Sequence, residues 1–493
     1  MNRNASNIIK SRKPYRALGL SAIGIFWLSF AHAGATPASG SLDLSFDTDG
    51  MVTTDLGYVH DVANATAIQS DGKIVAAGYK NIYVPYSQSY VAGAKDFALA
   101  RYNPNGTLDA SFGAGGKVFT DLGSPEDYIQ DIAIQPDGKI VVAGATAIMY
   151  CSTATDCYPL SRIAVARYNT NGSLDISFGN KGIVITSIGD ISRANAISLQ
   201  TDGRIVVGGA SGLSANYYSD DYTMVRYTSN GTLDSSFGVN GAVVTNLSDY
   251  IGNISSLRNE VISDLAIQTD GKIVAAGWAT VDLPLPNGGY KDNFAVVRYN
   301  SNGTLDSGFN SNGIVTTAFS GTYTYDQASS VAIQGDGKIV LGGVAGTFLS
   351  NQYNNSFSAF ALARYNANGS LDSTFGIGGK TTTAMGVAGA IGRAMKLQSD
   401  GKIVMAGVAS EAVKINGVLG YYPHFAIARY NTTGALDSRF GSQGKVLTFA
   451  GPIGGEARSL AIQADKKILA VGTITVPYNN YTGEDFSLMR YNP

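Results

Sequence analysis

Four carboxylates recur at one position of the chain and are its best candidates for chemistry. Each lies eight residues before the glutamine of a repeated string that is described below. Hard cations such as Ca²⁺ take several oxygen ligands, so a calcium site is one interpretation of these residues. A solvated acidic rim is the alternative, because the chain has no D-x-D-x-D-G loop. The predicted metal ligands are Asp61, Asp127, Glu260 and Asp326.

Groups for covalent or acid–base catalysis are few. Beyond the first 33 residues the histidines are His60 and His424, and the chain has no G-x-S-x-G, H-E-x-x-H or P-loop string. Two of the four carboxylates could serve a carbohydrate hydrolase or lyase, since that chemistry needs little more than a pair of carboxyl groups. Because no motif supports catalysis, we predict no catalytic residue, and no cofactor apart from the calcium considered above.

Tyrosine is the commonest aromatic residue, with 28 copies, and it is concentrated in long segments that differ from repeat to repeat. Beside serine, glycine and asparagine, tyrosine forms a rigid, amphipathic contact surface at low entropic cost. We therefore predict that these segments bind a ligand; the alternative is that the rings only pack the loops onto the fold. The predicted ligand contacts are Tyr83, Tyr86, Tyr90, Tyr150, Tyr217, Tyr218, Tyr290, Tyr353, Tyr421 and Tyr422.

The two cysteines, Cys151 and Cys157, lie in the short stretch CSTATDC. An oxidising compartment allows such a pair to close, so we predict a local disulfide between them. A zinc site is the alternative, but no histidine or further cysteine stands nearby to complete it.

All of these residues are set in a repeat that dominates the sequence. The string QPDGKIVVAG at 135–144 occurs in seven versions, and each is followed by a version of FALARYNPNGTLDASFG, with a period of about 66 residues. DIAIQ, KIVVAG and IAVARY are short, apolar and β-branched and predict three strands per unit, and a fourth is predicted at GTLDASFG, residues 106–113 in the first unit. Asp-Gly and Asn-Gly pairs predict tight turns between them. Seven units of four antiparallel strands predict a seven-bladed β-propeller.

The phase of the repeat predicts how the propeller closes. Residues 40–50, GSLDLSFDTDG, already contain the fourth-strand string, whereas the chain stops at Tyr491-Asn492-Pro493, where a fourth strand should begin. We therefore predict that residues 40–54 supply the outer strand of the blade built from 456–492, which removes two exposed strand edges. In the rival phase, residues 50–55 form the first strand of a self-contained blade.

The two strings, Q-x-D-G-K-I-V-x-x-G and R-Y-N-x-N-G-x-L-D-x-x-F-G, resemble those of the bacterial delta-60 repeat family, an exported β-propeller family of uncharacterised function. The resemblance covers residues 40–493 and depends on two strings that recur in fixed order. The order of strands and turns is also loosely similar to NHL-repeat propellers. Departures such as Lys466 and Thr228 weaken individual turns. The resemblance implies a fold and an exported setting, and it brings no catalytic residues.

The N-terminus has the parts of a secretory signal: a basic stretch to Arg16, an apolar run over 17–30 and Ala31-His32-Ala33. We predict a signal peptide at 1–33, a linker at 34–39 and a propeller at 40–493, in the periplasm or outside the cell. A membrane anchor is the alternative, but the apolar run is shorter than the roughly 20 residues that a spanning helix needs. After residue 33 the chain has 30 basic and 37 acidic residues, which argues against binding nucleic acid.

We therefore predict a monomeric, exported binding protein that recognises a cell-envelope polysaccharide or a protein through its Tyr-rich loops. Architecture repeated in every unit belongs to the scaffold, so function is expected where the repeats differ. A carbohydrate-active hydrolase or lyase and a structural surface component are the alternatives.

Overall fold

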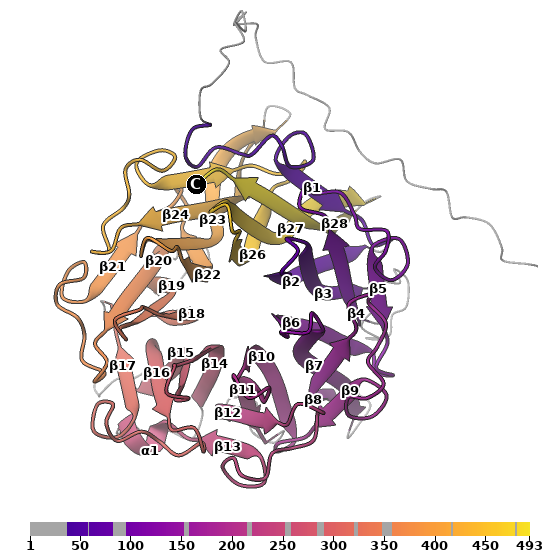
Figure 1. Cartoon of the computed structure of the whole chain (residues 1–493). Helices are drawn as coiled ribbons and strands as arrows, with labels where there is room; N and C mark the ends of the chain where they lie inside the picture. The colour runs from indigo at the N-terminus through magenta and orange to yellow at the C-terminus, as the bar shows by residue number, and fades with distance from the viewer. Residues whose placement is uncertain are drawn as a thin grey trace, which may run out of the picture. The chain divides into compact units, whose positions relative to one another are not determined.

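The computed structural model describes residues 37–57, 59–81, 95–151, 157–213, 219–251, 258–282, 290–319, 324–347, 357–415, 418–478 and 481–493. Within these ranges there are 28 β-strands and one four-residue helix, α1 (Ser248–Ile251). The strands form four-stranded antiparallel groups around a common centre (Figure 1). The predicted all-β, propeller-like fold is confirmed. Across the described ranges, no helix has the length and apolar character needed to cross a bilayer.

Each group contributes one strand to each of four positions, counted outward from the centre of Figure 1. The first strands are β2 (His60–Ile68), β6 (Glu126–Ile134), β10 (Ile191–Leu199), β14 (Arg258–Ile267), β18 (Gln327–Ile333), β22 (Ala390–Leu397) and β26 (Gly455–Ile462). The second strands are β3 (Ile74–Asn81), β7 (Ile140–Cys151), β11 (Ile205–Gly212), β15 (Ile273–Asp282), β19 (Ile339–Thr347), β23 (Ile403–Ile415) and β27 (Ile468–Tyr478).

The outer two positions complete the groups. The third strands are β4 (Lys95–Tyr102), β8 (Cys157–Tyr168), β12 (Ser219–Tyr227), β16 (Tyr290–Tyr299), β20 (Phe357–Tyr365), β24 (Val418–Tyr430) and β28 (Tyr481–Tyr491). The fourth strands are β5 (Lys117–Thr120), β9 (Ile183–Thr186), β13 (Ala242–Thr245), β17 (Ile314–Thr317), β21 (Lys380–Thr383), β25 (Lys445–Thr448) and β1 (Met51–Thr54). The first of these in the chain, β1, therefore completes the group that contains the last strand, β28.

The fourth strands do not form where the sequence predicts them. The string at 106–113 is a turn in which Leu108 makes a single bridge to Tyr102, and the strand itself begins at Lys117. The reason is local: Gly106 adopts a φ of 95° and the Asp109 side chain accepts the Ser111 N–H, so the chain curls before it extends. The string's fully buried Phe112 packs in the core between sheets.

Every first strand has a one-residue register shift against its second strand, such as that between Ile129 and Asp131. A shift of this kind is a β-bulge, and it re-aims the side chains beside it. Several of these side chains reach the next group. Asn64 Nδ2 donates to the Ile129 carbonyl at 2.8 Å, and Asp131 accepts the Ile197 N–H at 2.8 Å. The bulges therefore join neighbouring sheets near the centre of the fold.

A buried arginine joins neighbouring groups at the outer turns. Arg101 Nε donates to Asp109 at 2.8 Å, its guanidinium lies 4.5 Å from the centre of the Phe112 ring, and Nη1 donates to the carbonyl of Thr170 in the following group. Desolvation opposes ionisation of Asp109, but hydrogen bonds from Ser111 and the charges of Lys73 and Arg101 hold its pKa well below the usual range. The same Arg–Asp pair recurs in the other groups, so these residues form a structural network that joins neighbouring groups.

Candidate functional site

The four carboxylates predicted as metal ligands all lie at the junction between one group and the next. Each accepts a backbone N–H from the segment that follows the preceding fourth strand: Leu56 for Asp61, Leu122 for Asp127, Leu247 for Glu260 and Phe319 for Asp326. At the equivalent position of another group, Ser192 Oγ accepts from Ile188 at 3.2 Å. Anchoring this connection is therefore a first role of these side chains.

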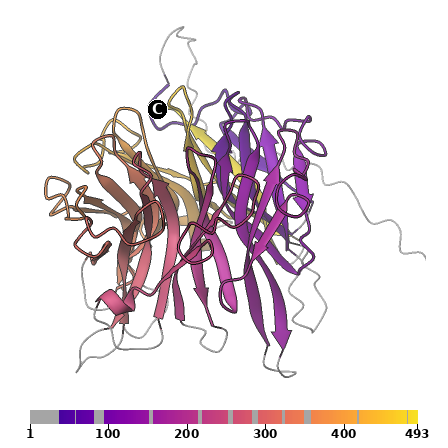
Figure 2. The ribbon, with the colours of Figure 1, turned by 60° about the horizontal axis from the view of Figure 1, so that its bottom comes forward.

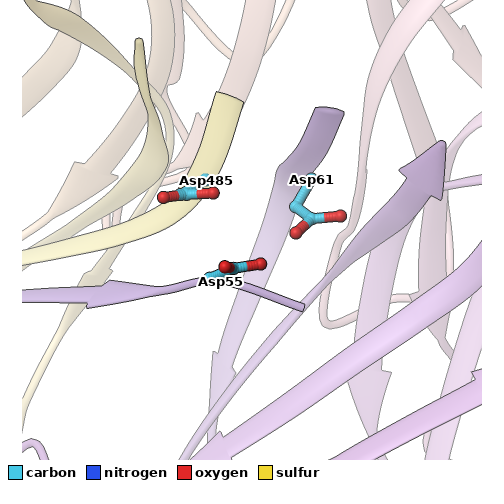
Figure 3. A group of neighbouring side chains, drawn as sticks. All are labelled: Asp55, Asp61 and Asp485. Carbon is cyan, nitrogen blue, oxygen red and sulfur yellow. The ribbon is translucent and has the colours of Figure 1, made fainter. Parts of the chain in front are cut away.

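Asp61 and Asp127 belong to two separate clusters, each of three aspartate side chains. Figure 3 shows Asp61 on β2 together with Asp55, which follows β1, and Asp485 on β28. One carboxylate oxygen from each lies within 4.8 Å of the others. The second cluster lies one repeat further along the chain and consists of Asp96, Asp121 and Asp127. Among the described residues, Glu260 and Asp326 belong to neither cluster, so the four predicted ligands do not share one close cluster.

Sequence reasoning missed the other members of these clusters, although a signal was present. Asp55 and Asp121 lie in the same string, T-D-L-G, one repeat apart. Asp96 and Asp485 each precede a phenylalanine of a third strand. Because the first strand of one group lies beside the third strand of the previous one, as at the Lys95–Glu126 bridge, these two positions meet across the junction.

A lysine partly neutralises the negative charge of the cluster that contains Asp96, Asp121 and Asp127. Lys80, which is buried, places its ammonium 2.8 Å from Asp96. Desolvation raises the pKa of Asp127, against hydrogen bonds from Ser124 and from Thr146 that lower it. A lysine ammonium among these carboxylates supplies positive charge that a metal ion would otherwise bring.

None of the four predicted ligands is exposed. Asp61, Asp127, Glu260 and Asp326 have at most 1% of their surface exposed. Desolvation raises the pKa of Glu260 to about 7 and that of Asp326 to about 6, which suits a general acid, but a buried carboxyl cannot reach the glycosidic bond of a polymer. The geometry therefore gives no support to cleavage by these residues.

Most of the predicted tyrosine contacts lie outside the described residues. The described ones are Tyr421 and Tyr422. Those outside are Tyr83, Tyr86, Tyr90, Tyr217, Tyr218 and Tyr353. For Tyr150 and Tyr290 the backbone lies in β7 and β16, while the side chains are outside the described part.

The hairpin β23–β24 carries the tyrosines that can be placed. Each of its strands has 13 residues, against eight in β3 and β4. Tyr421 is 67% exposed and Leu419 is 62% exposed, whereas Tyr422 is half-buried and packs edge-on against Phe449 with 6.3 Å between ring centres. His424 also contacts the Phe449 ring, with 5.1 Å between centres. One tyrosine of the pair therefore packs the hairpin and the other faces solvent.

The tip of this hairpin lies at the same end of the domain as the carboxylates. Asn81 at the end of β3 pairs with Lys95 at the start of β4, and Thr120 at the end of β5 pairs with Phe97, so the connections after second and fourth strands emerge together. Figure 2 shows α1, which follows a fourth strand, and the β7–β8 hairpin extending toward the same, lower end. Exposed apolar residues at this end form the loop face: Ile148, Leu213, Tyr250, Val387, Leu419, Tyr421 and Phe449.

Cys151 and Cys157 are register partners at the loop end of the β7–β8 hairpin, and their side chains lie outside the described residues. The disulfide stays a prediction. Because directly opposed positions of an antiparallel pair bring Cβ atoms within about 4.5–5.5 Å, a modest adjustment allows the bond. We expect alkylation of the unreduced, denatured protein to leave the intact mass unchanged, and alkylation after reduction to add two adducts. Two adducts without reduction would contradict the prediction.

Comparison with family models identifies one family. A model described as "Domain of unknown function (DUF5122) beta-propeller" matches six segments that together cover about half of the chain. The segments are 69–112, 135–178, 200–237, 268–309, 334–375 and 398–440. No curated protein matches the chain.

Several solved structures have a similar fold at low identity. A protein of unknown function from Dyadobacter fermentans is 11% identical, with 90% of this chain and 99% of that chain covered and a TM-score of 0.42. An ulvan lyase, from a new family of polysaccharide lyases, is 11% identical over 88% and 95%, with a TM-score of 0.45. The α-L-arabinanase of Penicillium chrysogenum is 11% identical over 89% and 98%, with a TM-score of 0.39.

Proposed function

The chain belongs to the DUF5122 β-propeller family, and from this premise we propose that it is an exported binding module whose loop face recognises a cell-envelope polysaccharide, with a protein as the other class of partner. A repeat that supplies the same Arg–Asp pair and the same turns in each unit is a scaffold. Recognition then depends on the segments that differ, which are the connections after second and fourth strands.

The architecture that we propose for this module is a single domain over residues 40–493, with seven blades and a closed ring. Closure is supported by the antiparallel pairing of β1 with β28, from Met51 opposite Met489 to Thr54 opposite Phe486. The parallel bridge between His60 and Glu484 adds a link from β28 to the first strand of the next group. The signal peptide at 1–33, the linker at 34–39 and the monomeric state belong to the same proposal.

The observation that carries the binding role is the β23–β24 hairpin. Its tip exposes Leu419 and Tyr421 to solvent, while Tyr422 and Phe449 fix its base by packing. A rigidly held, exposed aromatic ring is the group that stacks on a sugar or fills a protein pocket. Ile148 and Leu213 lie at the same end, on other hairpins, so the apolar contacts are spread over several repeats.

We expect Tyr421→Ala to lower retention on the cognate envelope polysaccharide by about tenfold or more, with little change in melting temperature, since the ring is mostly exposed. The assay is retention of the mature protein on a panel of envelope polysaccharides and peptidoglycan. The matched control is Ile176→Ala, an apolar residue that is at least as exposed and lies in a turn after a third strand, at the opposite end.

Three outcomes separate the candidate roles. Binding that is lost with Tyr421 and kept in the control supports glycan recognition. No retention on any polysaccharide, followed by capture of an envelope protein through the same face, moves the proposal to a protein partner. Equal binding by both variants contradicts a role for the loop face.

A further inference from the structure

Three buried oxygen atoms at one junction have no hydrogen-bond partner in the described part of the chain. They are Oδ1 of Asn293, Oγ1 of Thr324 and Oδ1 of Asp326. The three residues are at most 7% exposed. A buried polar atom that is left without a partner costs about 1–3 kcal/mol of stability. Three such oxygens at one junction therefore suggest a ligand that binds them. We name these residues the Asp326 cluster.

Backbone pairing places the three side chains on one side of the junction. Asp292 donates its N–H to the Thr324 carbonyl and accepts the Asp326 N–H, so β16 lies beside residues 324–326. The Asp292 side chain accepts from Thr280 and Gln327 on the opposite side. Because side chains alternate along an extended chain, Asn293 faces away from Asp292, and Thr324 and Asp326 face away from Gln327.

The repeat gives a second reason to place these side chains together. Asn293 precedes Phe294 of a third strand and Asp326 lies eight residues before Gln334, so they correspond to Asp96 and Asp127. In that equivalent junction, carboxylate oxygens of both aspartates lie within 4.8 Å of each other. There, Ser124 also donates to Asp127 at 2.5 Å, whereas the Thr324 hydroxyl makes no such bond to Asp326.

The charge of the cluster favours a cation. Asp326 Oδ2 is held by the Phe319 N–H at 2.8 Å, which leaves Oδ1 for another partner. Desolvation is the largest effect on Asp326, and it outweighs the N–H groups of Phe319 and Gly346 and the charges of Lys291 and Lys380, all of which lower its pKa. No ammonium comparable to that of Lys80 at Asp96 is in contact with Asp326 among the described ion pairs.

We propose that the Asp326 cluster binds a hard divalent cation, Ca²⁺, between β16 and the segment that leads into β18. Its side-chain donor atoms are a carboxylate, an amide and a hydroxyl oxygen, and oxygen-only sets of this kind are those that calcium selects. Such an ion would join two neighbouring groups, in the same place where the other junctions use N–H and hydroxyl donors. This proposal is independent of the loop face and of its ligand.

The test uses two isosteric variants, Thr324→Val and Asn293→Asp, in the full mature protein, which is stripped of calcium with EGTA and then titrated with CaCl₂. Thr324→Val removes only the hydroxyl oxygen. Without calcium we expect this variant to melt above wild type, since an unpartnered buried oxygen is gone. With calcium we expect it to melt below wild type, and calorimetry to show about tenfold or more weaker binding at one site. The matched control is Thr317→Val, whose hydroxyl accepts from Tyr365 at 2.8 Å and whose loss should lower the melting temperature equally in both conditions.

Asn293→Asp tests the cluster in the opposite direction. The equivalent residue in three other repeats is aspartate, namely Asp96, Asp221 and Asp485, so the fold accommodates it. We expect tighter calcium binding and, in EGTA, a lower melting temperature because two carboxylates then face each other. Calcium affinity that changes in neither variant, or wild-type protein that shows no calcium-dependent heat at millimolar concentration, overturns the proposal and leaves a proton on Asp326 or a buried water as the partner of these oxygens.

Discussion

Removal of residues 37–54 is expected to abolish the cooperative unfolding transition and to leave a protein that aggregates. The segment supplies β1, whose four residues pair with β28, and it places Phe46 in a core cluster with Leu488. Phe46 is fully buried beneath the guanidinium of Arg490, 4.5 Å from the ring centre. Without the segment, β28 is left as a long unpaired edge, which is a template for association between chains.

One ion pair accounts for much of the expected loss. Asp43 accepts from Arg490 at 2.7 Å and lies 2.9 Å from the Lys467 ammonium. Desolvation opposes its ionisation, but Lys467, the hydrogen bonds from Ser45 and the charge of Arg490 lower its pKa to about 2. Asp43→Ala leaves the buried Arg490 without its carboxylate, which typically costs about 3–5 kcal/mol.

The measurement is thermal and urea unfolding of a chain that begins at Pro37 against one that begins at Asp55, with light scattering to follow aggregation. Asp175→Ala, which breaks the equivalent pair with Arg167 within continuous sequence, is the matched control for Asp43→Ala. A synthetic peptide of residues 37–54 should restore solubility to the truncated chain. A truncated chain that melts like the longer one would show that β1 does not complete the fold.

Raising the pH from 5 to 8 is expected to lower the stability of the folded protein, and Asp131→Asn should flatten that decline. Asp131 is half-buried near the centre of the fold; desolvation and the charge of Asp264 raise its pKa to about 7, despite the N–H groups of Ile197 and Ile132. In the unfolded chain its pKa is about 3.9. Between these values the folded state binds more protons, so stability is lost as the pH rises, by about 2–3 kcal/mol from pH 5 to pH 8.

The readout is the slope of stability with pH, because Asp131→Asn also loses an acceptor for one of two N–H groups and will be less stable at every pH. Glu260 and Asp326, whose pKa values are raised to about 7 and about 6, contribute declines of the same sign that persist in the variant. Asp137→Asn, at an exposed turn, is the control. An Asp131→Asn slope equal to that of wild type would contradict the assignment.

Much of the scaffold could be predicted because the same sequence strings recur in each repeat. The Arg101–Asp109 pairing and the strands around KIV follow from local strings whose physics is the same in each copy. The fourth strands were misplaced because a bridge at Leu108 and a turn at Phe112 look, in sequence, like a short apolar strand. The order in which the chain curls and then extends is set by the Gly106 and Asp109 turns.

The candidate site was harder to predict because its members come from separate segments of the chain: Asp55 follows β1, Asp61 lies on β2 and Asp485 lies on β28. Asp61 and Asp326 were found through their fixed distance from a glutamine, but burial and the partners across the junction cannot be read from spacing. Asp485 lies more than 400 residues from Asp61, so only the meeting of the two chain ends brings them together. The Asp326 cluster stayed hidden for another reason: Asn293 and Thr324 carry no charge and belong to no recognisable ligand string.

The pairing of β1 with β28 also sets the order in which the fold can be finished. The bond between Asp43 and Arg490 joins residues 447 positions apart, so β1 cannot pair until β28 has been synthesised. Entropy makes this closure only slowly more costly with length, but contacts of such sequence separation form late. A chain that is interrupted between Asp43 and Arg490 therefore cannot pair β1 with β28, and we expect residues 37–54 of such a chain to stay open to proteases.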